Sequence, residues 1–161
     1  MSQYSASIFL PDDDATTALG ARLAPLLRAG DTILLEGPIG AGKTHLCRAL
    51  IQARLAEAGL VEDVPSPTYT LVQTYSDGDT EIWHADLYRL SDPFELIELG
   101  LDDAFSSAIA LVEWPDRLGD LAPPDALTMT LAIEGDGRRL TAHSPDQRWS
   151  RISDTLETGD G

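Results

Sequence analysis

The chain has 161 residues, of which 43% are hydrophobic, so it is long enough for one domain with a sizeable core. Its formal net charge of −16 would repel a polyanion, which disfavours direct tight binding of nucleic acid. The one candidate for a local basic patch is a sparse cluster of arginines near the C-terminus: Arg138, Arg139, Arg148 and Arg151. No apolar stretch approaches the length of a membrane span and a single cysteine excludes an intrachain disulfide, so we expect a cytoplasmic protein without a membrane segment.

Strand and helix signals alternate through the N-terminal part of the chain. Residues 5–10 predict a first strand, and residues 12–29 predict a helix with acidic residues in its first turn, which Pro25 divides or kinks. The apolar run of residues 31–36 predicts a second strand. From residue 43 to residue 58, apolar side chains recur at three- and four-residue spacing, which predicts an amphipathic helix.

The rest of the chain carries signals for two hairpins, one buried strand and two helices. Strands are expected at residues 66–75, 80–87, 108–112, 127–133 and 138–143. The first two and the last two of these flank short turn segments, and the third (AIALV) is a continuous apolar run, as expected of a strand buried on both faces. One helix is expected to begin at Asp92, with Pro93 in its first position and Glu95 closing a capping box. The last helix is expected after a cap at residues 144–147.

A glycine-rich stretch, GPIGAGKT, joins the second expected strand to the following helix. It has the form G-x-x-x-x-G-K-T, in which glycines let backbone N–H groups turn toward phosphate oxygens and the helix N-terminus adds a partial positive charge. Lys43 is the only lysine of the chain, and its compact, mobile ammonium suits the β- and γ-phosphates better than a planar guanidinium. The Thr44 hydroxyl suits Mg²⁺. We therefore expect nucleotide binding by Ile39, Gly40, Ala41, Gly42, Lys43 and Thr44.

Two acids that close apolar strands could complete such a site with a carboxylate that holds a metal or orients water. Glu113 follows the AIALV run, and Asp86 lies in HADLYR. Because an open parallel sheet binds its ligands at the carboxyl ends of its strands, both acids can converge on the glycine-rich loop. Thr68 and Thr70 could add a hydroxyl, although on sequence alone they are ordinary strand threonines. His84 indicates packing or a local hydrogen bond.

Strands interleaved with helices, together with two hairpins, predict an α/β fold: a three-layer P-loop NTPase-like domain with a mixed, mostly parallel central sheet. We expect a single ATPase domain over residues 1–156 and a disordered tail over residues 157–161.

Four motifs, in this order and spacing, resemble the TsaE family: GPIGAGKT, SPTYTLV, HADLYRL and LVEWPDR. The likeness extends from residue 9 to the GRR of the last hairpin. Ala85 departs from the family pattern, where phenylalanine is more frequent, and so does His45, where a second threonine is common. Neither departure touches the catalytic groups. Members of the family are small bacterial ATPases of threonylcarbamoyladenosine biosynthesis in tRNA, so the resemblance implies a protein that binds and slowly hydrolyses Mg-ATP in complex with TsaD and TsaB.

The resemblance also implies roles for individual residues. Lys43, Asp86 and Glu113 would be catalytic, with Glu113 holding Mg²⁺ beside Thr44 and Asp86 acting as the catalytic or metal-associated acid of a switch II-like segment. Thr68 would sense the metal or the γ-phosphate in a switch I-like segment. Four further residues match positions close to the nucleotide: Trp114, Asp13, Asp116 and Arg138.

Three alternatives stay open beside this interpretation. A small-molecule kinase for a nucleoside or sugar would use several arginines in a mobile lid, whereas Arg89 and Arg117 are isolated and no arginine-dense insertion is evident. A GTPase commonly selects guanine with Asn-Lys-x-Asp, which a chain with Lys43 as its only lysine cannot contain. A non-enzymatic binding module would need the loop but neither Asp86 nor Glu113.

Overall fold

The computed structural model describes residues 4–65, 71–152 and 156 of the chain. Within these ranges the strands are β1 (Tyr4–Leu10), β2 (Thr32–Glu36), β3 (Val72–Ser76), β4 (Glu81–Asp86), β5 (Ile109–Glu113), β6 (Leu127–Glu134) and β7 (Gly137–Ser144). The α-helices are α1 (Asp13–Leu23), α2 (Lys43–Glu57), α3 (Phe94–Leu99) and α4 (Leu101–Ser107), and the 3-10 helices are η1 (Ala24–Leu26), η2 (Pro115–Leu121) and η3 (Gln147–Ile152). The N-terminal part of the strand expected at residues 66–75, and the tail expected at residues 157–161, lie outside the described residues.

All seven strands belong to one mixed sheet with the order β1-β7-β6-β2-β5-β4-β3. The pairings of β2 with β6, β2 with β5 and β4 with β5 are parallel, whereas β1–β7, β6–β7 and β3–β4 are antiparallel. The sheet is therefore mixed, as predicted, but the expectation of a mostly parallel sheet is wrong. The reason is local, because a short turn can join only antiparallel neighbours and two of the three antiparallel pairs are such hairpins.

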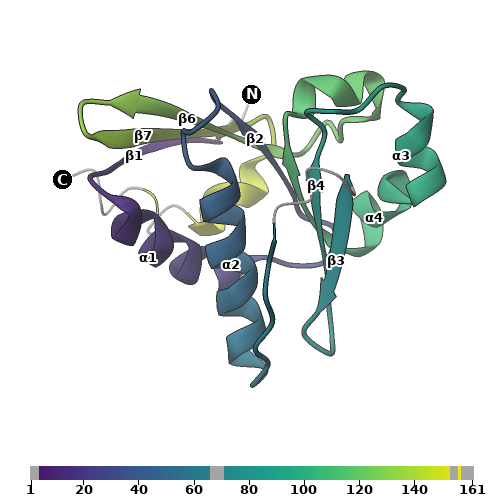
Figure 1. Cartoon of the computed structure of the whole chain (residues 1–161), viewed down its shortest axis with the longest axis horizontal. Coiled ribbons are helices and arrows are strands. Elements are labelled where there is room, and N and C mark those ends of the chain that lie inside the picture. The colour runs from purple at the N-terminus through teal and green to yellow at the C-terminus, as the bar shows by residue number, and fades with distance from the viewer. Residues whose placement is uncertain (1–3, 66–70, 153–155, 157–161) are drawn as a thin grey trace.

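The two faces of the sheet are covered differently (Figure 1). Helices α1 and α2 lie together on one face, where alternate residues of the strands, such as Ile33 and Leu111, join one large apolar cluster. The opposite face of β2, β5 and β4 is covered by α3, α4 and η2 through a second cluster that includes Leu34, Leu96 and Val112. Over the centre of the sheet the expected three layers are present.

The third layer does not extend over the strands β1, β6 and β7. Their alternate residues on that side are open to solvent, with Ser5, Thr141 and His143 exposed, while Ile8 and Leu140 point into the first cluster. This part of the fold has two layers, so the three-layer expectation holds for only part of the sheet. A hairpin with alternating polar and apolar residues needs cover on one face only.

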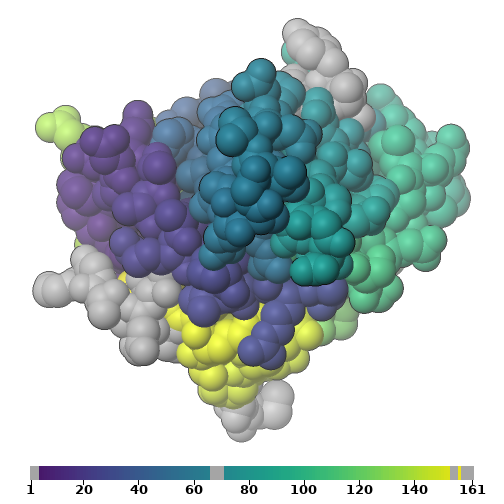
Figure 2. Space-filling model, turned by 90° about the horizontal axis from the view of Figure 1, so that it is seen from below, coloured from purple at the N-terminus to yellow at the C-terminus, as the bar shows by residue number. Residues whose placement is uncertain are grey.

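Several helix ends differ from the sequence expectations. The division at Pro25 is confirmed, because α1 ends at Leu23 and a 3-10 turn containing Pro25 follows. Helix α3 begins one residue later than expected, and the Asp92 carboxylate accepts a hydrogen bond from the Phe94 N–H at 3.0 Å. Between residues 147 and 152 the last helix is a 3-10 helix, and this C-terminal segment lies against the residues that precede β2 (Figure 2). Helices α4 and η2 were not predicted.

Register in the parallel part of the sheet determines where the site lies. Strand β5 lies between β2 and β4, so that Glu113 pairs with Leu35 on one side and with Asp86 on the other. Both acids therefore end neighbouring parallel strands at the edge where β2 leads into the glycine-rich loop.

Candidate functional site

The glycine-rich loop leaves β2 at Gly37 and enters α2 at Lys43. Gly37 has φ +145°, and a Cβ added there would lie 2.5 Å from the Leu131 carbonyl oxygen of β6, so only glycine allows this close approach. Gly42 has φ +100° directly before α2, a left-handed conformation that L side chains rarely adopt. The two glycines fold the loop back over the N-terminus of α2, whose unpaired backbone N–H groups favour an anion.

Lys43 is 5% exposed and its ammonium lies inside the loop. It donates hydrogen bonds to the carbonyl oxygens of Gly37 and Pro38, the latter at 3.1 Å. Its Nζ also lies 4.0 Å from the centroid of the Trp114 ring. Burial lowers the pKa of Lys43, and the charges of Glu113 and Asp86 oppose this shift. The only lysine of the chain is thus held inside the loop by two carbonyl oxygens and one aromatic ring.

Glu113 is held at both carboxylate oxygens and is 2% exposed. The Thr44 hydroxyl donates to its Oε1 at 2.7 Å, and the Nε2 of His84 lies 2.7 Å from its Oε2. These contacts connect α2, β4 and β5 across 69 and 29 residues of sequence. A hydroxyl and a carboxylate side by side are the oxygen ligands that Mg²⁺ prefers.

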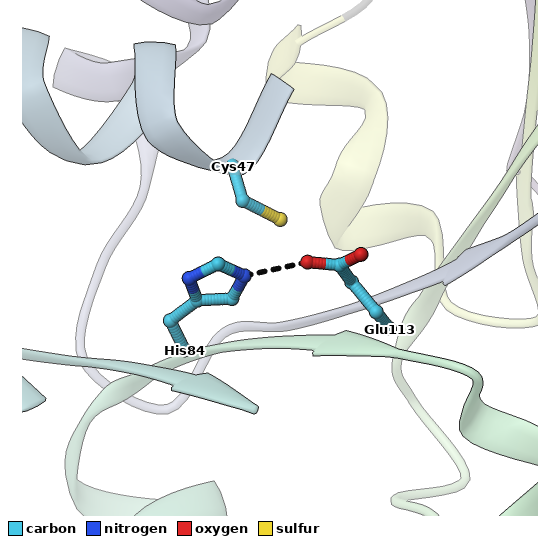
Figure 3. Close-up of side chains that lie close together, drawn as sticks. All are labelled: Cys47, His84 and Glu113. Carbon is cyan, nitrogen blue, oxygen red and sulfur yellow. Dashed lines mark hydrogen bonds and ion pairs between the residues drawn. The ribbon is translucent and has the colours of Figure 1, made fainter. Parts of the chain in front are cut away.

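Cys47 points from α2 toward this pair (Figure 3). Its Sγ, one nitrogen of His84 and one carboxylate oxygen of Glu113 lie within 4.8 Å of one another, and all three side chains are buried. Burial raises the pKa of the Cys47 thiol well above its ordinary value of 9.0, and the charges of Glu113 and Asp86 raise it further. A neutral thiol packed against a hydrogen-bonded pair is a core group and a poor metal ligand, since metals bind the thiolate.

Asp86 ends β4 on the same face as His84, because residues two apart in a strand share a face. It is 6% exposed, and its Oδ1 accepts a hydrogen bond from the Tyr88 N–H at 3.1 Å. Its own N–H donates to the Leu71 carbonyl oxygen at 2.8 Å. The Tyr88 N–H therefore orients the carboxylate, while the bond to Leu71 fixes the main chain of Asp86.

These groups surround one cleft of about 360 Å³. Its lining residues are Ile39, Gly40, Gly42, Lys43, Thr44, His45, Asp86, Tyr88, Glu113 and Trp114. The structure therefore brings together the predicted loop residues, both predicted acids and Trp114. The exception in the loop is Ala41, which is buried in the core beneath it at 1% exposure.

Trp114 has the left-handed conformation at φ +59°, which is uncommon for a large side chain. The backbone N–H of Trp114 donates to the Leu35 carbonyl oxygen at 3.3 Å. Its ring lies 4.9 Å from the ring of Tyr88 at a tilt of 50°. The turn after β5 thus directs an aromatic pair over the cleft beside Lys43.

The more distant predicted contacts do not line the cleft. Arg138 contacts a lining residue, because its guanidinium donates to the Gly40 carbonyl oxygen at 3.2 Å. The Asp13 carbonyl oxygen lies 3.2 Å from the Nε2 of His45, so Asp13 touches a lining residue through its backbone. The Asp116 side chain is 70% exposed and forms a 3.8 Å ion pair with Arg117. Thr68 lies outside the described residues.

Three residues of the site were not expected there from the sequence. His45 and Tyr88 line the cleft, and His84 forms the buried contact to Glu113, which is more than the packing or local hydrogen bond expected of it. The signal for His84 was its place two residues before Asp86 in a predicted strand, which puts both side chains on one face. The partner of His84 could not be inferred, because it lies on another strand.

The fold and the site define an α/β protein with a glycine-rich strand-loop-helix and two acids at the carboxyl ends of adjoining strands. A family model described as "Threonylcarbamoyl adenosine biosynthesis protein TsaE" matches residues 10–141. The chain therefore belongs to the TsaE family, which confirms the resemblance drawn from its motifs. Among the residues that the structure describes, no helix is long and apolar enough to cross a membrane.

Related proteins are similar in sequence to almost the whole of this chain. Two relatives carry the name tRNA threonylcarbamoyladenosine biosynthesis protein TsaE. The protein of Rickettsia felis is 33% identical, and the match covers 93% of this chain and 86% of the relative. The protein of Nostoc sp. is 35% identical, and the match covers 94% of this chain and 91% of the relative. The corresponding protein of Bacillus subtilis is 31% identical and covers 91% and 90%. The crystal structure of YdiB from Bacillus subtilis superposes with a TM-score of 0.78 at 24% identity, covering 100% of this chain and 99% of that chain, which supports the fold.

Proposed function

We propose that this protein is an ATPase subunit of the bacterial machinery that forms N6-threonylcarbamoyladenosine in tRNA. In this proposal it binds and hydrolyses Mg-ATP in the described cleft, in the cytoplasm and in complex with TsaD and TsaB. The family assignment and the names of its relatives support the pathway. The observation that carries the ATPase activity is the contact between the Thr44 hydroxyl and the Glu113 carboxylate, 2.7 Å long and beside the only lysine.

The side chains of the cleft fit a nucleotide with a divalent cation. Thr44 and Glu113 offer hard oxygen ligands, and a carboxylate that already accepts from the hydroxyl is in place to share a cation with it. When bound, Mg²⁺ would neutralise charge on the β- and γ-phosphate oxygens. Lys43 would exchange the Gly37 and Pro38 carbonyls for phosphate oxygens, which are stronger acceptors because they are charged.

Asp86 and Trp114 would complete the reaction site. The Asp86 carboxylate is buried and accepts a hydrogen bond from the Tyr88 N–H at the end of the strand next to Glu113, where it could orient a water or share the metal. The ring of Trp114, which contacts Lys43, would exclude water from the phosphates. Slow turnover by the isolated chain is expected, since none of the described residues that line the cleft is an arginine that could stabilise transition-state charge.

The first experiment is ATP hydrolysis by the purified chain with Mg²⁺, alone and with TsaD, TsaB or both. Turnover that rises only with the partners, with one phosphate released per ADP, is the expected result. Turnover indifferent to the partners would contradict the partner-dependent role. ADP formed without free phosphate, in the presence of nucleosides or sugars, would indicate a small-molecule kinase instead.

A further inference from the structure

We propose that His84 is a positioning residue that fixes the carboxylate of Glu113 against Thr44. His84 is fully buried, and its Nε2 lies 2.7 Å from Glu113 Oε2, while Thr44 contacts Oε1 at the same distance. With one donor at each oxygen, the carboxylate plane is determined from both sides. A carboxylate bonded at one oxygen alone could rotate about its terminal bond, which has a broad torsional preference.

The environment of the imidazole indicates which nitrogen carries the proton. Among the residues that the structure describes, Nδ1 of His84 is buried and has no hydrogen-bond partner. A proton on Nδ1 would leave a buried N–H without an acceptor, whereas a proton on Nε2 is donated to a carboxylate at short distance. The contacts therefore assign the Nε2–H tautomer, with Nδ1 as an unprotonated nitrogen.

Packing prevents water from replacing the imidazole. Cys47 is 1% exposed and projects from α2 toward the His84–Glu113 pair, so the space beside the pair is filled by a neutral thiol (Figure 3). Loss of the His84 donor would leave Glu113 Oε2 buried without compensation, which costs more than the bond itself contributes. The carboxylate would then turn away from Thr44 toward other donors of the cleft.

The expected consequence for the metal rests on the proposed function. Residues that orient a metal ligand without touching the metal typically change metal affinity about 10- to 100-fold when they are replaced. His84→Leu removes the donor and keeps an apolar side chain of similar size. His84→Gln retains an N–H donor at nearly the same reach. Cys47→Ala is the matched control, since it changes the same buried cluster without removing a hydrogen bond to Glu113.

The experiment titrates Mg²⁺ at constant ATP and measures hydrolysis with TsaD and TsaB, and nucleotide binding in EDTA is measured in parallel. His84→Leu should raise the Mg²⁺ concentration for half-maximal rate about 10-fold or more, while His84→Gln and Cys47→Ala stay within about threefold of the parent. Nucleotide affinity in EDTA should stay within about threefold for all variants. Equal impairment of the Leu and Gln variants, or an unaffected Leu variant, would overturn the positioning role.

A second measurement uses the parent protein, so it does not depend on the folding of any variant. ¹⁵N NMR of the three imidazoles at neutral pH reports which nitrogen of each is protonated. A proton on Nε2 of His84 supports the proposal, and Nε2 without a proton overturns it. If the parent protein shows no Mg²⁺-dependent hydrolysis with or without its partners, the proposed function fails, and the NMR result alone decides whether His84 holds Glu113.

Discussion

At the scale of single residues, the ammonium of Lys43 is already satisfied by its own loop. Its two carbonyl acceptors and the Trp114 ring replace the water that burial removes. Burial lowers the pKa of Lys43, whereas the charges of Glu113 and Asp86 act to raise it. Lys43 is also the first residue of α2, at the helix end whose dipole favours negative charge.

Replacing Lys43 therefore tests the loop directly. Lys43→Ala should weaken ATP binding about 10- to 100-fold, the size of one charge-assisted hydrogen bond to phosphate. Lys43→Arg should not restore binding, because a planar guanidinium does not reproduce the compact, mobile charge of an ammonium. Equilibrium binding of a fluorescent ATP analogue checks both variants. Parent-like affinity of Lys43→Ala would contradict a phosphate role for this loop.

Replacing Glu113 should separate turnover from affinity. Glu113→Gln keeps the size of the side chain and an acceptor oxygen, and it removes the negative charge. Mg²⁺-dependent hydrolysis should fall about 100-fold or more, while ATP affinity in EDTA should change less than about threefold. The exposed Glu134, which pairs with Arg139 at 2.9 Å, provides the control Glu134→Gln, expected to behave as the parent. Hydrolysis at the parent rate by Glu113→Gln would exclude a metal-holding role for this acid.

At the scale of elements, Arg54 ties α2 to two of its neighbours. Its guanidinium donates to the carbonyl oxygens of Ala24 and Leu27, both at 2.7 Å, and to the Asp77 carboxylate at 3.0 Å. Asp77 in turn accepts from the N–H groups of Asp79 and Thr80 in the β3–β4 turn. The C-terminal part of α2 is thus held to η1 and to the β3–β4 hairpin.

Asp77 should contribute stability that depends on pH. Burial acts to raise its pKa, but the hydrogen bonds from Thr80, Asp79 and Arg54 together lower it below the ordinary value of 3.8. A carboxyl with a lowered pKa in the folded state stabilises above the unfolded pKa, and this contribution is lost as the pH falls through the folded pKa. Asp77→Asn should therefore cost about 1 kcal/mol at pH 7 and progressively less below pH 3.8.

Urea unfolding of the parent and of Asp77→Asn between pH 7 and pH 3 measures this difference. Asp79→Asn, in the same turn but exposed, is the matched variant and should change stability little at any pH. A constant difference between Asp77→Asn and the parent across this range would show that the charge of Asp77 is not what stabilises the turn.

At the scale of the whole molecule, the arginines near the C-terminus are engaged within the protein. Arg151 donates to the Leu26 carbonyl oxygen at 3.0 Å and pairs with the buried Asp31, and Arg148 pairs with Asp125 at 3.1 Å. Two arginines of the suggested basic patch thus join η3 to the segments that precede β2 and β6. The other two, Arg138 and Arg139 of β7, contact Gly40 and Glu134. This use of the arginines supports the proposal that the acidic protein does not bind tRNA tightly by itself.

Arg151→Ala should destabilise the protein by about 3 kcal/mol, since it leaves the buried carboxylate of Asp31 with a weaker partner. Arg148 lies 4.0 Å from Asp31 and is more exposed, so Arg148→Ala should cost less than about 1 kcal/mol. Thermal unfolding compares the two variants. ATP affinity of both should equal that of the parent, because neither residue lines the cleft. Equal destabilisation by the two replacements would contradict the ranking.

Local pattern in the sequence determined the strands, the glycine-rich loop, the lysine and the two strand-end acids. Each of these depends on neighbours in the chain: an apolar run followed by Glu113, or glycines followed by Lys43 at a helix start. The division at Pro25 has the same local cause. Most of the loop residues, both acids and Trp114, all named from the sequence, therefore line one cleft, while nucleotide binding there stays a prediction.

Only the tertiary structure decided which of these groups meet. The strand order puts β5 between β2 and β4, and this order brings Thr44, His84 and Glu113 into contact across 69 and 29 residues. It also decided that β1 pairs antiparallel with β7 and that the third layer covers only the centre of the sheet. Such pairings follow from burial summed over the whole chain, which no local window of sequence contains.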